Sequence, residues 1–344
     1  MNRIRCLISL VSLLFVTNSY SELHESGVWI STPEVMALDS EGDAWLSVVD
    51  WANRPVEWPS LADQDNPGNV QTLASALYAV RTGNAQKRRD VEQTLMDIQG
   101  TEKGGTALAL SRELAAYVIA ADLIKLQGES RYRFVQWLEH LRKMQFKGRS
   151  IRSTHEDRPN NWGTHAGATR IALAVYLQDR EELQRAAHVF KGWLGEPDGW
   201  RDFEFGETWW QPWGFRNYGI NPAGVTLWGH SIDGVLPDDQ RRGGPLQWPP
   251  PKENYVYEAL QGAVAQAIML ERQGFDPWAW GDRALLRAFT WLHEQADFPA
   301  EGDDTWMPHV INRVYGSRFP APTPSVPGKA VGFTDWTYQR YAGR

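Results

Sequence analysis

The chain has 344 residues, with 35 lysines and arginines against 42 aspartates and glutamates, and a formal net charge of −7. This length is enough for one large domain or two ordinary ones with a substantial core. An acidic chain has no overall attraction for nucleic acid, so we expect no nucleic-acid partner; a local basic cluster remains as the way to bind a polyanion.

The N-terminus has the features of an export signal. Two arginines precede an apolar run over residues 6–16, and small residues follow at Ser19 and Ser21. This order is typical of a secretory signal peptide. We therefore expect residues 1–21 to be a signal peptide and the mature protein to be periplasmic or secreted, with no membrane anchor. The single cysteine lies in the signal, so no disulfide is expected in the mature chain.

Helical periodicity dominates the rest of the chain, and strand-like alternation is scarce. Residues 106–128 are the clearest case, because Leu110, Leu114 and Tyr117 recur on one helical face. The other predicted helices are 69–84, 90–100, 131–146, 166–179, 180–195, 255–274 and 282–296. Successive helices joined by short turns predict antiparallel hairpins. We expect an all-α fold, an α/α toroid that forms an incomplete barrel of such hairpins.

Two long stretches, 196–254 and 298–344, lack helical periodicity. We expect them to form loops over the central groove of the toroid, and the proline-rich residues 319–329 predict a tether. No convincing domain boundary interrupts the chain.

Tryptophan is unusually frequent, with 18 residues, and Trp209 and Trp210 belong to a crowded stretch. An indole ring suits either a sugar-stacking surface or a buried core. Both interpretations stay open from the sequence: a wall that binds carbohydrate, or a long loop fixed by buried rings.

Several kinds of chemistry have no signature here. The sequence contains no glycine-rich phosphate loop, no Gly-x-Ser-x-Gly nucleophile elbow and no Cys/His metal set. We therefore expect no metal and no cofactor.

The stretch "RPNNWGTHAG" at 158–167 stands out instead. Asparagine is a good helix cap, but a cap needs only one such residue. Asn161 and His165 are four residues apart, so a helix places them on one face.

These residues carry a family resemblance. "NNWGTHAGATRIALAVYLQDREEL" (160–183) resembles the active-site helix of the alginate lyases, which carry Asn-Asn-His-x-Tyr-Trp-Ala-Gly in an α/α toroid. "DGVLPDDQRR" (233–242) is similar to that family's Gly-x-Leu-Pro-x-Glu-Leu, and the Tyr-x-Ala-Leu at 257–260 resembles its Asn-Tyr-Ala-Leu. The resemblance implies that residues 22–344 form a single catalytic domain, which cleaves a 4-linked uronate polymer such as polymannuronate or glucuronan.

The chain also departs from the family pattern. Trp162 stands where the alginate lyases have histidine, and His165 stands where they have tryptophan. Their catalytic arginine precedes the tyrosine by seven residues, and no arginine occurs at that distance before Tyr257. About thirty extra residues separate the asparagine helix from "DGVLP". The chain thus resembles a divergent member.

β-Elimination requires removal of a weakly acidic proton beside a carboxylate, so the carboxylate has to be neutralised and a proton has to be exchanged. We assign neutralisation to Asn161 with Arg242. Tyr257 is assigned as acid/base, with His165 as its partner or as the base; Tyr255 and Tyr257 are two apart, so only one can serve. The residues expected to bind substrate are Asn160, Trp162, Trp209, Trp210, His230, Arg241 and Tyr255.

Two alternatives remain. A toroidal glycoside hydrolase would need two carboxylates, for which the candidates are Asp202, Glu204, Glu207, Asp233 and Asp239. A non-catalytic polysaccharide-binding protein would use the tryptophans alone. In each case the expected partner is an acidic polysaccharide, and the protein is expected to be a monomer.

Overall fold

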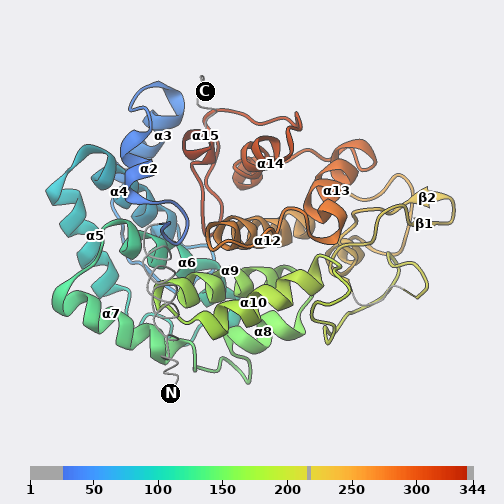
Figure 1. Cartoon of the computed structure of the whole chain (residues 1–344), viewed down its shortest axis with the longest axis horizontal. Helices are drawn as coiled ribbons and strands as arrows, with labels where there is room; N and C mark the ends of the chain where they lie inside the picture. The colour runs from blue at the N-terminus through green and yellow to red at the C-terminus, as the bar shows by residue number, and fades with distance from the viewer. Residues whose placement is uncertain (1–25, 215–217, 339–344) are drawn as a thin grey trace, which may run out of the picture.

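The computed structural model describes residues 26–214 and 218–338, so the predicted signal peptide lies outside the described residues. Helices make up most of this part of the chain (Figure 1). Its strands form a single two-residue hairpin, β1 (Thr226–Leu227) paired with β2 (His230–Ser231). The expected all-α class is confirmed.

Four helices form an inner row in which each packs against the next. They are α4 (Gly68–Thr82), α6 (Ala107–Leu123), α9 (Asn161–Tyr176) and α12 (Asn254–Arg272). Every residue of α6 is buried, and so are most residues of α9 and α12. Because α6 is apolar along most of its length, it has to lie inside the fold, and its many alanines permit close neighbours.

The helices between them have one buried face and lie outside the inner row. They are α3 (Gly42–Asn53), α5 (Ala85–Asp97), α7 (Gly128–Leu141), α8 (Ile151–Asp157) and α10 (Arg180–Trp193). In α10, for example, Leu183 and Phe190 are buried while Arg180 faces solvent. Outer and inner helices alternate from α3 to α7 and again from α8 to α10, which gives the predicted hairpins, while α7 and α8 are two outer helices in succession (Figure 1).

The remaining elements are short or belong to the C-terminal part. They are α2 (Thr32–Ala37), α11 (Pro237–Gln240), η1 (Arg241–Gly243), α13 (Trp280–Glu294), η2 (Gly302–Asp304), α14 (Met307–Tyr315) and α15 (Thr334–Thr337). The last of these, α15, packs on α3. There the Trp336 indole donates to the Asp39 carbonyl at 2.7 Å, and its ring lies 5.0 Å from that of Trp45. These contacts join the two ends of the described chain.

The segment 319–329 is exposed at Pro320 and over 322–324, but its C-terminal part is mostly buried and hydrogen-bonded to the protein, so it is not the free tether that its prolines predicted. The Ser325 backbone N–H donates to Asp335 at 2.9 Å, and the Lys329 backbone N–H donates to Gln261 on α12 at 2.8 Å. This corrects the sequence-based expectation, because partners far away in the sequence hold the segment in place.

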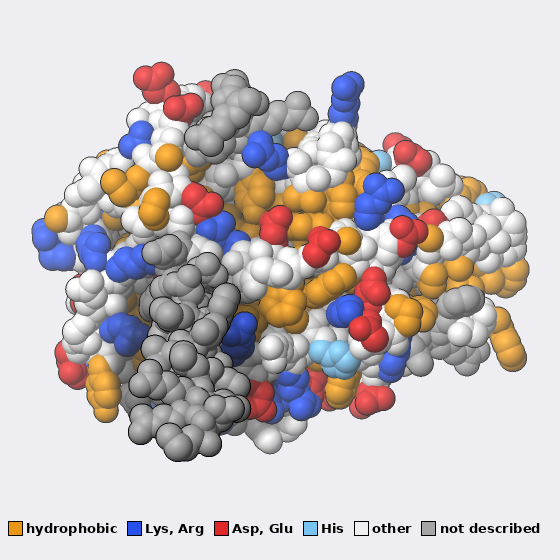
Figure 2. Space-filling view, in the orientation of Figure 1, with side chains coloured by type: hydrophobic (Ala, Val, Ile, Leu, Met, Phe, Trp, Pro, Cys, Tyr) orange, Lys and Arg blue, Asp and Glu red, His pale blue; other side chains and the backbone are white. Residues whose placement is uncertain are grey.

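No helix in the described part of the chain is long and apolar enough to cross a membrane. On the face drawn in Figure 2, lysine and arginine side chains are interspersed with aspartate and glutamate. Positive charge is therefore not gathered into one broad surface on that side.

Candidate active site

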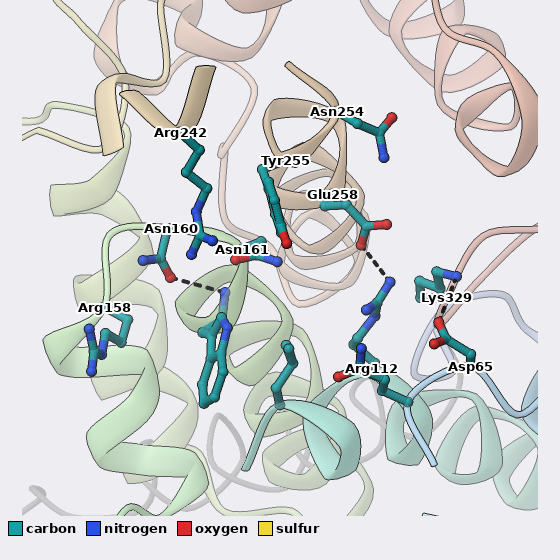
Figure 3. A pocket seen from close by; sticks show the side chains of 13 residues that line it. Asp65, Arg112, Arg158, Asn160, Asn161, Arg242, Asn254, Tyr255, Glu258 and Lys329 are labelled. Atoms are coloured by element: carbon teal, nitrogen blue, oxygen red, sulfur yellow. Dashed lines mark hydrogen bonds and ion pairs between the residues drawn. The ribbon is translucent and has the colours of Figure 1, made fainter. Parts of the chain in front are cut away.

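A cavity of about 690 Å³ lies where the inner helices begin (Figure 3). Its wall comes from the first turns of α6, α9 and α12, from the loop before α4, and from two distant segments. The lining residues are Gln64, Asp65, Leu108, Arg112, Arg158, Asn160, Asn161, Trp162, Arg242, Asn254, Tyr255, Glu258 and Lys329. Helix N-termini favour anions, because the first backbone N–H groups are unpaired and the helix dipole is positive there.

Asn160 and Asn161 lie at the start of α9, and both are almost fully buried. Asn160 is the cap: its side-chain oxygen accepts from the Trp162 N–H at 3.2 Å, and its amide donates to Asp238 at 2.8 Å. The backbone N–H of Asn161 donates to Asp239 at 3.1 Å. The Asn161 side-chain oxygen has no hydrogen-bond partner among the described residues. The Asn161 amide nitrogen also donates to no described residue, so its N–H groups are available to a ligand carboxylate in the cavity.

Asp238 and Asp239, from the "LPDD" segment, hold this pair in place. Burial raises the pKa of Asp239 well above its usual range, and the neighbouring Asp238 charge adds to that rise. Asp239 is fully buried, so its role is to position Asn161 and not to contact a ligand.

Tyr255 and Arg242 form the opposite wall. The Arg242 guanidinium lies over the Tyr255 ring, 4.2 Å from its centroid, although the two residues are thirteen apart in the sequence. Tyr255 is 42% exposed. In Figure 3 its hydroxyl is directed toward Asn161 at the start of α9. One cavity thus presents a phenol, a guanidinium and an unpartnered amide.

Positive charge exceeds negative charge around the cavity, with four cationic side chains and two carboxylates. Arg158 and Arg242 form no ion pair within the described ranges. This is the local basic cluster that an acidic chain needs in order to bind a polyanion. No group of three or more His, Cys, Asp or Glu side chains suited to a metal ion occurs in residues 26–214 and 218–338.

Comparison with known proteins gives one family match. Residues 100–200 match the family model described as "Alginate lyase". The chain is alginate lyase-like. No curated protein matches it significantly.

Solved structures show the same fold. The alginate lyase A1-III from Sphingomonas species A1 superimposes with a TM-score of 0.50 at 13% identity, over 94% of each chain. A variant of alginate lyase A1-III complexed with a tetrasaccharide gives a TM-score of 0.51 at 13% identity and the same coverage. These matches confirm the predicted α/α toroid, at a sequence identity of only 13%. The match over residues 100–200 and the shared fold make the chain similar to alginate lyases.

Tyr257 needs a correction in this alginate lyase-like chain. Its ring is fully buried, and its hydroxyl donates to the Phe298 carbonyl at 2.7 Å. Burial raises the pKa of Tyr257 far above its usual range. Two residues along a helix turn the side chain by about 200°, so Tyr255 faces the cavity and Tyr257 faces the core. The tyrosine assigned to binding is the one positioned for chemistry.

His165 also lies behind the cavity wall. It is 1% exposed, and its Nε2 is 3.9 Å from the Glu258 carboxylate. Burial lowers the pKa of His165, which outweighs the opposing effect of Glu258. His165 does not line the cavity, contrary to the expectation that it acts there as the partner of the tyrosine or as the base.

Other expected binding residues lie outside the cavity. Arg241 is paired with Asp238 at 2.9 Å, and His230 stacks on Trp248 with ring centroids 4.3 Å apart. Trp210 is fully buried and donates to the Gly244 carbonyl at 2.9 Å, so it has no free face for a sugar. Trp209 is 43% exposed. Within the Trp-rich stretch, Trp210 therefore belongs to the hydrophobic core and Trp209 lies at the surface.

Several lining residues were missed from the sequence. Arg112 carried a usable signal, because a charged residue inside the apolar run 106–128 has to find a partner. Glu258 is three residues after Tyr255 and so lies on the same face of the helix. The choice of Tyr257 directed attention to the opposite face. Lys329 reaches the cavity from the C-terminal segment, and no local pattern predicts this contact.

Proposed function

We propose that the chain cleaves a 4-linked uronate polymer, such as polymannuronate or glucuronan, by β-elimination in this cavity. The observation that carries the proposal is the meeting of Asn161, Arg242 and Tyr255 in one positively charged cavity at the start of α9 and α12. An acidic polysaccharide is the substrate class that such a cavity attracts. The relative that was solved with a tetrasaccharide supports a polysaccharide substrate.

Asn161 and Arg242 have the task of neutralising the uronate carboxylate. As the C5 proton leaves, negative charge spreads onto that carboxylate, and fixed donors stabilise it more in the transition state than in the ground state. The unpartnered amide of Asn161 and the unpaired guanidinium of Arg242 are groups of this kind.

Tyr255 exchanges the protons. The C5–H bond breaks and its electron pair becomes the C4–C5 double bond, while the C4–O4 bond breaks and O4 leaves with a proton. A positioned phenol serves as acid or base in such a step. Tyr255 is the exposed phenol of the cavity, and the two lining carboxylates, Glu258 and Asp65, are held in ion pairs.

A glycoside hydrolase has less support. None of the five acids predicted for hydrolysis lines the cavity. Asp233 is paired with Arg287 and Asp239 holds the backbone of Asn161, so these two have structural roles.

The test is to incubate the protein with polymannuronate, polyguluronate and glucuronan, and to follow the ultraviolet absorbance of the unsaturated uronate. We expect new double bonds from at least one polymer. New reducing ends without absorbance would indicate hydrolysis, and binding without any product would indicate a non-catalytic protein. Either result would contradict the proposal.

We also propose that the protein acts outside the cytoplasm, as a periplasmic or secreted enzyme. The basic and apolar order of residues 1–21 supports export. Expression of the full chain in a bacterial host followed by N-terminal sequencing tests this; a product that starts near residue 22 is expected, and an intact N-terminus in the cytoplasm would contradict export.

A further inference from the structure

The cavity is divided by charge into two halves. In Figure 3, Arg158 and Arg242 lie on one side of Tyr255 and Asn161, and the remaining charged residues lie on the other side. The first half contains unpaired guanidinium groups and no carboxylate. We call the second half the paired half; its charged residues are Arg112, Glu258, Lys329 and Asp65.

The cations of the paired half are already neutralised. Arg112 donates to Glu258 at 2.6 Å, and these side chains are only 6% and 15% exposed. The ammonium of Lys329 lies 3.6 Å from Asp65 and 3.3 Å from Asp303. Because the Arg112–Glu258 pair is sheltered from water, its attraction is weakly screened and the two charges are costly to separate.

A second uronate in this half would place its carboxylate beside Glu258 and Asp65. Like charges at such short range repel, and separating Arg112 from Glu258 would leave a buried charge without its partner. An uncharged sugar meets no such cost. Its hydroxyls can donate to the two carboxylates and accept from the arginine, the lysine and the amides of Gln64 and Asn254.

We propose that the paired half binds an uncharged sugar, so that the preferred substrate is a heteropolymer in which a 4-linked uronate adjoins a neutral sugar. The inference rests on the proposed β-elimination, which it places in the half with the unpaired guanidiniums. It changes the expected substrate from a homopolymer to a mixed polymer.

Glucuronan provides a matched pair of probes. Reduction of about half of its carboxylates to primary alcohols keeps every linkage and creates uronates next to neutral glucose. We expect the initial rate of double-bond formation, per remaining uronate, to be about tenfold higher on the reduced polymer, as repulsion between charges near a protein surface permits. An equal or higher rate on intact glucuronan would overturn the inference.

Charge variants test whether the paired half causes the preference. Glu258→Gln removes a negative charge and keeps an acceptor for Arg112. Asp65→Asn removes the other negative charge at a side chain that is 66% exposed, so this variant is expected to fold even if Glu258→Gln does not. We expect the rate ratio to fall toward one in at least one of these variants. Asp198→Asn is the control, because Asp198 is 71% exposed, pairs with Lys191 and does not line the cavity.

The outcomes separate the two proposals. A ratio that is unchanged in both variants overturns the inference. Unsaturated product that forms fastest from intact glucuronan also overturns it, but leaves β-elimination standing. If neither glucuronan probe gives product, the same comparison is made with polymannuronate and its half-reduced form, and no unsaturated product from any of these polymers contradicts the proposed function itself.

Discussion

Asn160 and Asn161 are adjacent in the sequence, but their side chains have different surroundings. Asn160 caps α9 and donates to Asp238, while the side-chain oxygen of Asn161 lacks a partner among the described residues. A buried polar atom without a partner lowers stability, so it persists where it serves a ligand. Structural work and chemical work are thus divided between two identical residues.

Asn161→Ala should lower kcat by about a hundredfold, because it removes a donor that acts on charge in the transition state. Its free energy of unfolding should change little, since no side-chain hydrogen bond is lost. Asn160→Ala is the matched control and should lower the free energy of unfolding by about 1 kcal/mol through loss of the cap. Near-normal turnover of Asn161→Ala in a kinetic assay would contradict its role.

The sequence predicted several of the residues that line the cavity, but it assigned the catalytic role to the wrong tyrosine. Asn160, Asn161, Trp162, Arg242 and Tyr255 line it as expected for binding or chemistry. The choice between the two tyrosines failed because it relied on the resemblance of residues 257–260 to Asn-Tyr-Ala-Leu, and an error of two residues turns a helical side chain to the other face. The family's seven-residue distance between arginine and tyrosine was also misleading for Arg242. The proline-rich loop after η1 lengthens that distance to thirteen residues, but it still brings the Tyr255 ring against the Arg242 guanidinium.

At the scale of elements, the packing of α9 against α12 places the two sides of the cavity together. Gly262 of α12 permits it: a Cβ atom there would lie 2.5 Å from the His165 backbone nitrogen. Because backbone cannot move as a flexible side chain does, the helices would have to separate.

Gly262→Ala should therefore lower the free energy of unfolding by about 1–3 kcal/mol. An alanine in an open helix would raise it by up to about 1 kcal/mol instead, so the sign of the change is informative. Urea unfolding measures it. A variant as stable as the parent would show that the helices do not approach so closely.

The Trp-rich loop gives a second prediction at this scale. Trp210→Ala should lower the free energy of unfolding by about 3–5 kcal/mol, because its ring is fully buried. Trp209→Ala should have a small effect on stability and should raise KM for long chains more than for short ones, if the exposed ring contacts sugars beyond the cavity. Equal KM changes for every chain length would leave Trp209 without a binding role.

The long helices were predictable because their apolar periodicity is strong, as in residues 106–128 against the observed α6. The short helices α2, α11 and α15 were not predicted, since four to six residues are too few to show a period. They depend on caps and on tertiary contacts instead. The longer helices α3 and α14 and the seven-residue α8 were missed as well, and α14 lies in the stretch 298–344 that was expected to be a loop.

At the scale of the whole molecule, the C-terminal segment closes the cavity by contacts that no local pattern encodes. It brings Lys329 to Asp65, and it brings Asp304 to Gln261 at 2.9 Å. Burial raises the pKa of Asp304 to about 8 from an ordinary value of 3.8. Between these pH values the folded protein binds a proton that the unfolded chain releases, so stability falls as pH rises through this window.

Asp304→Asn should remove that dependence, because an amide does not titrate. The variant should gain stability relative to the parent between about pH 5 and about pH 9, by several kcal/mol, since each unit of pKa shift corresponds to about 1.4 kcal/mol. Urea unfolding at both pH values measures the difference. A stability gap that is independent of pH would mean that Asp304 is ionised in the folded protein.

The central claim is that the phenol facing the cavity performs the elimination, and a pair of matched variants tests it most directly. Tyr255→Phe and Tyr257→Phe each remove one hydroxyl, the first from the cavity and the second from a bond to Phe298 in the core. The measurement is the rate of unsaturated-uronate formation on the most active polymer. We predict that Tyr255→Phe loses about two to four orders of magnitude in rate, while Tyr257→Phe retains its rate and loses about 1 kcal/mol of stability. An active Tyr255→Phe variant, or an inactive and fully stable Tyr257→Phe variant, would contradict the account.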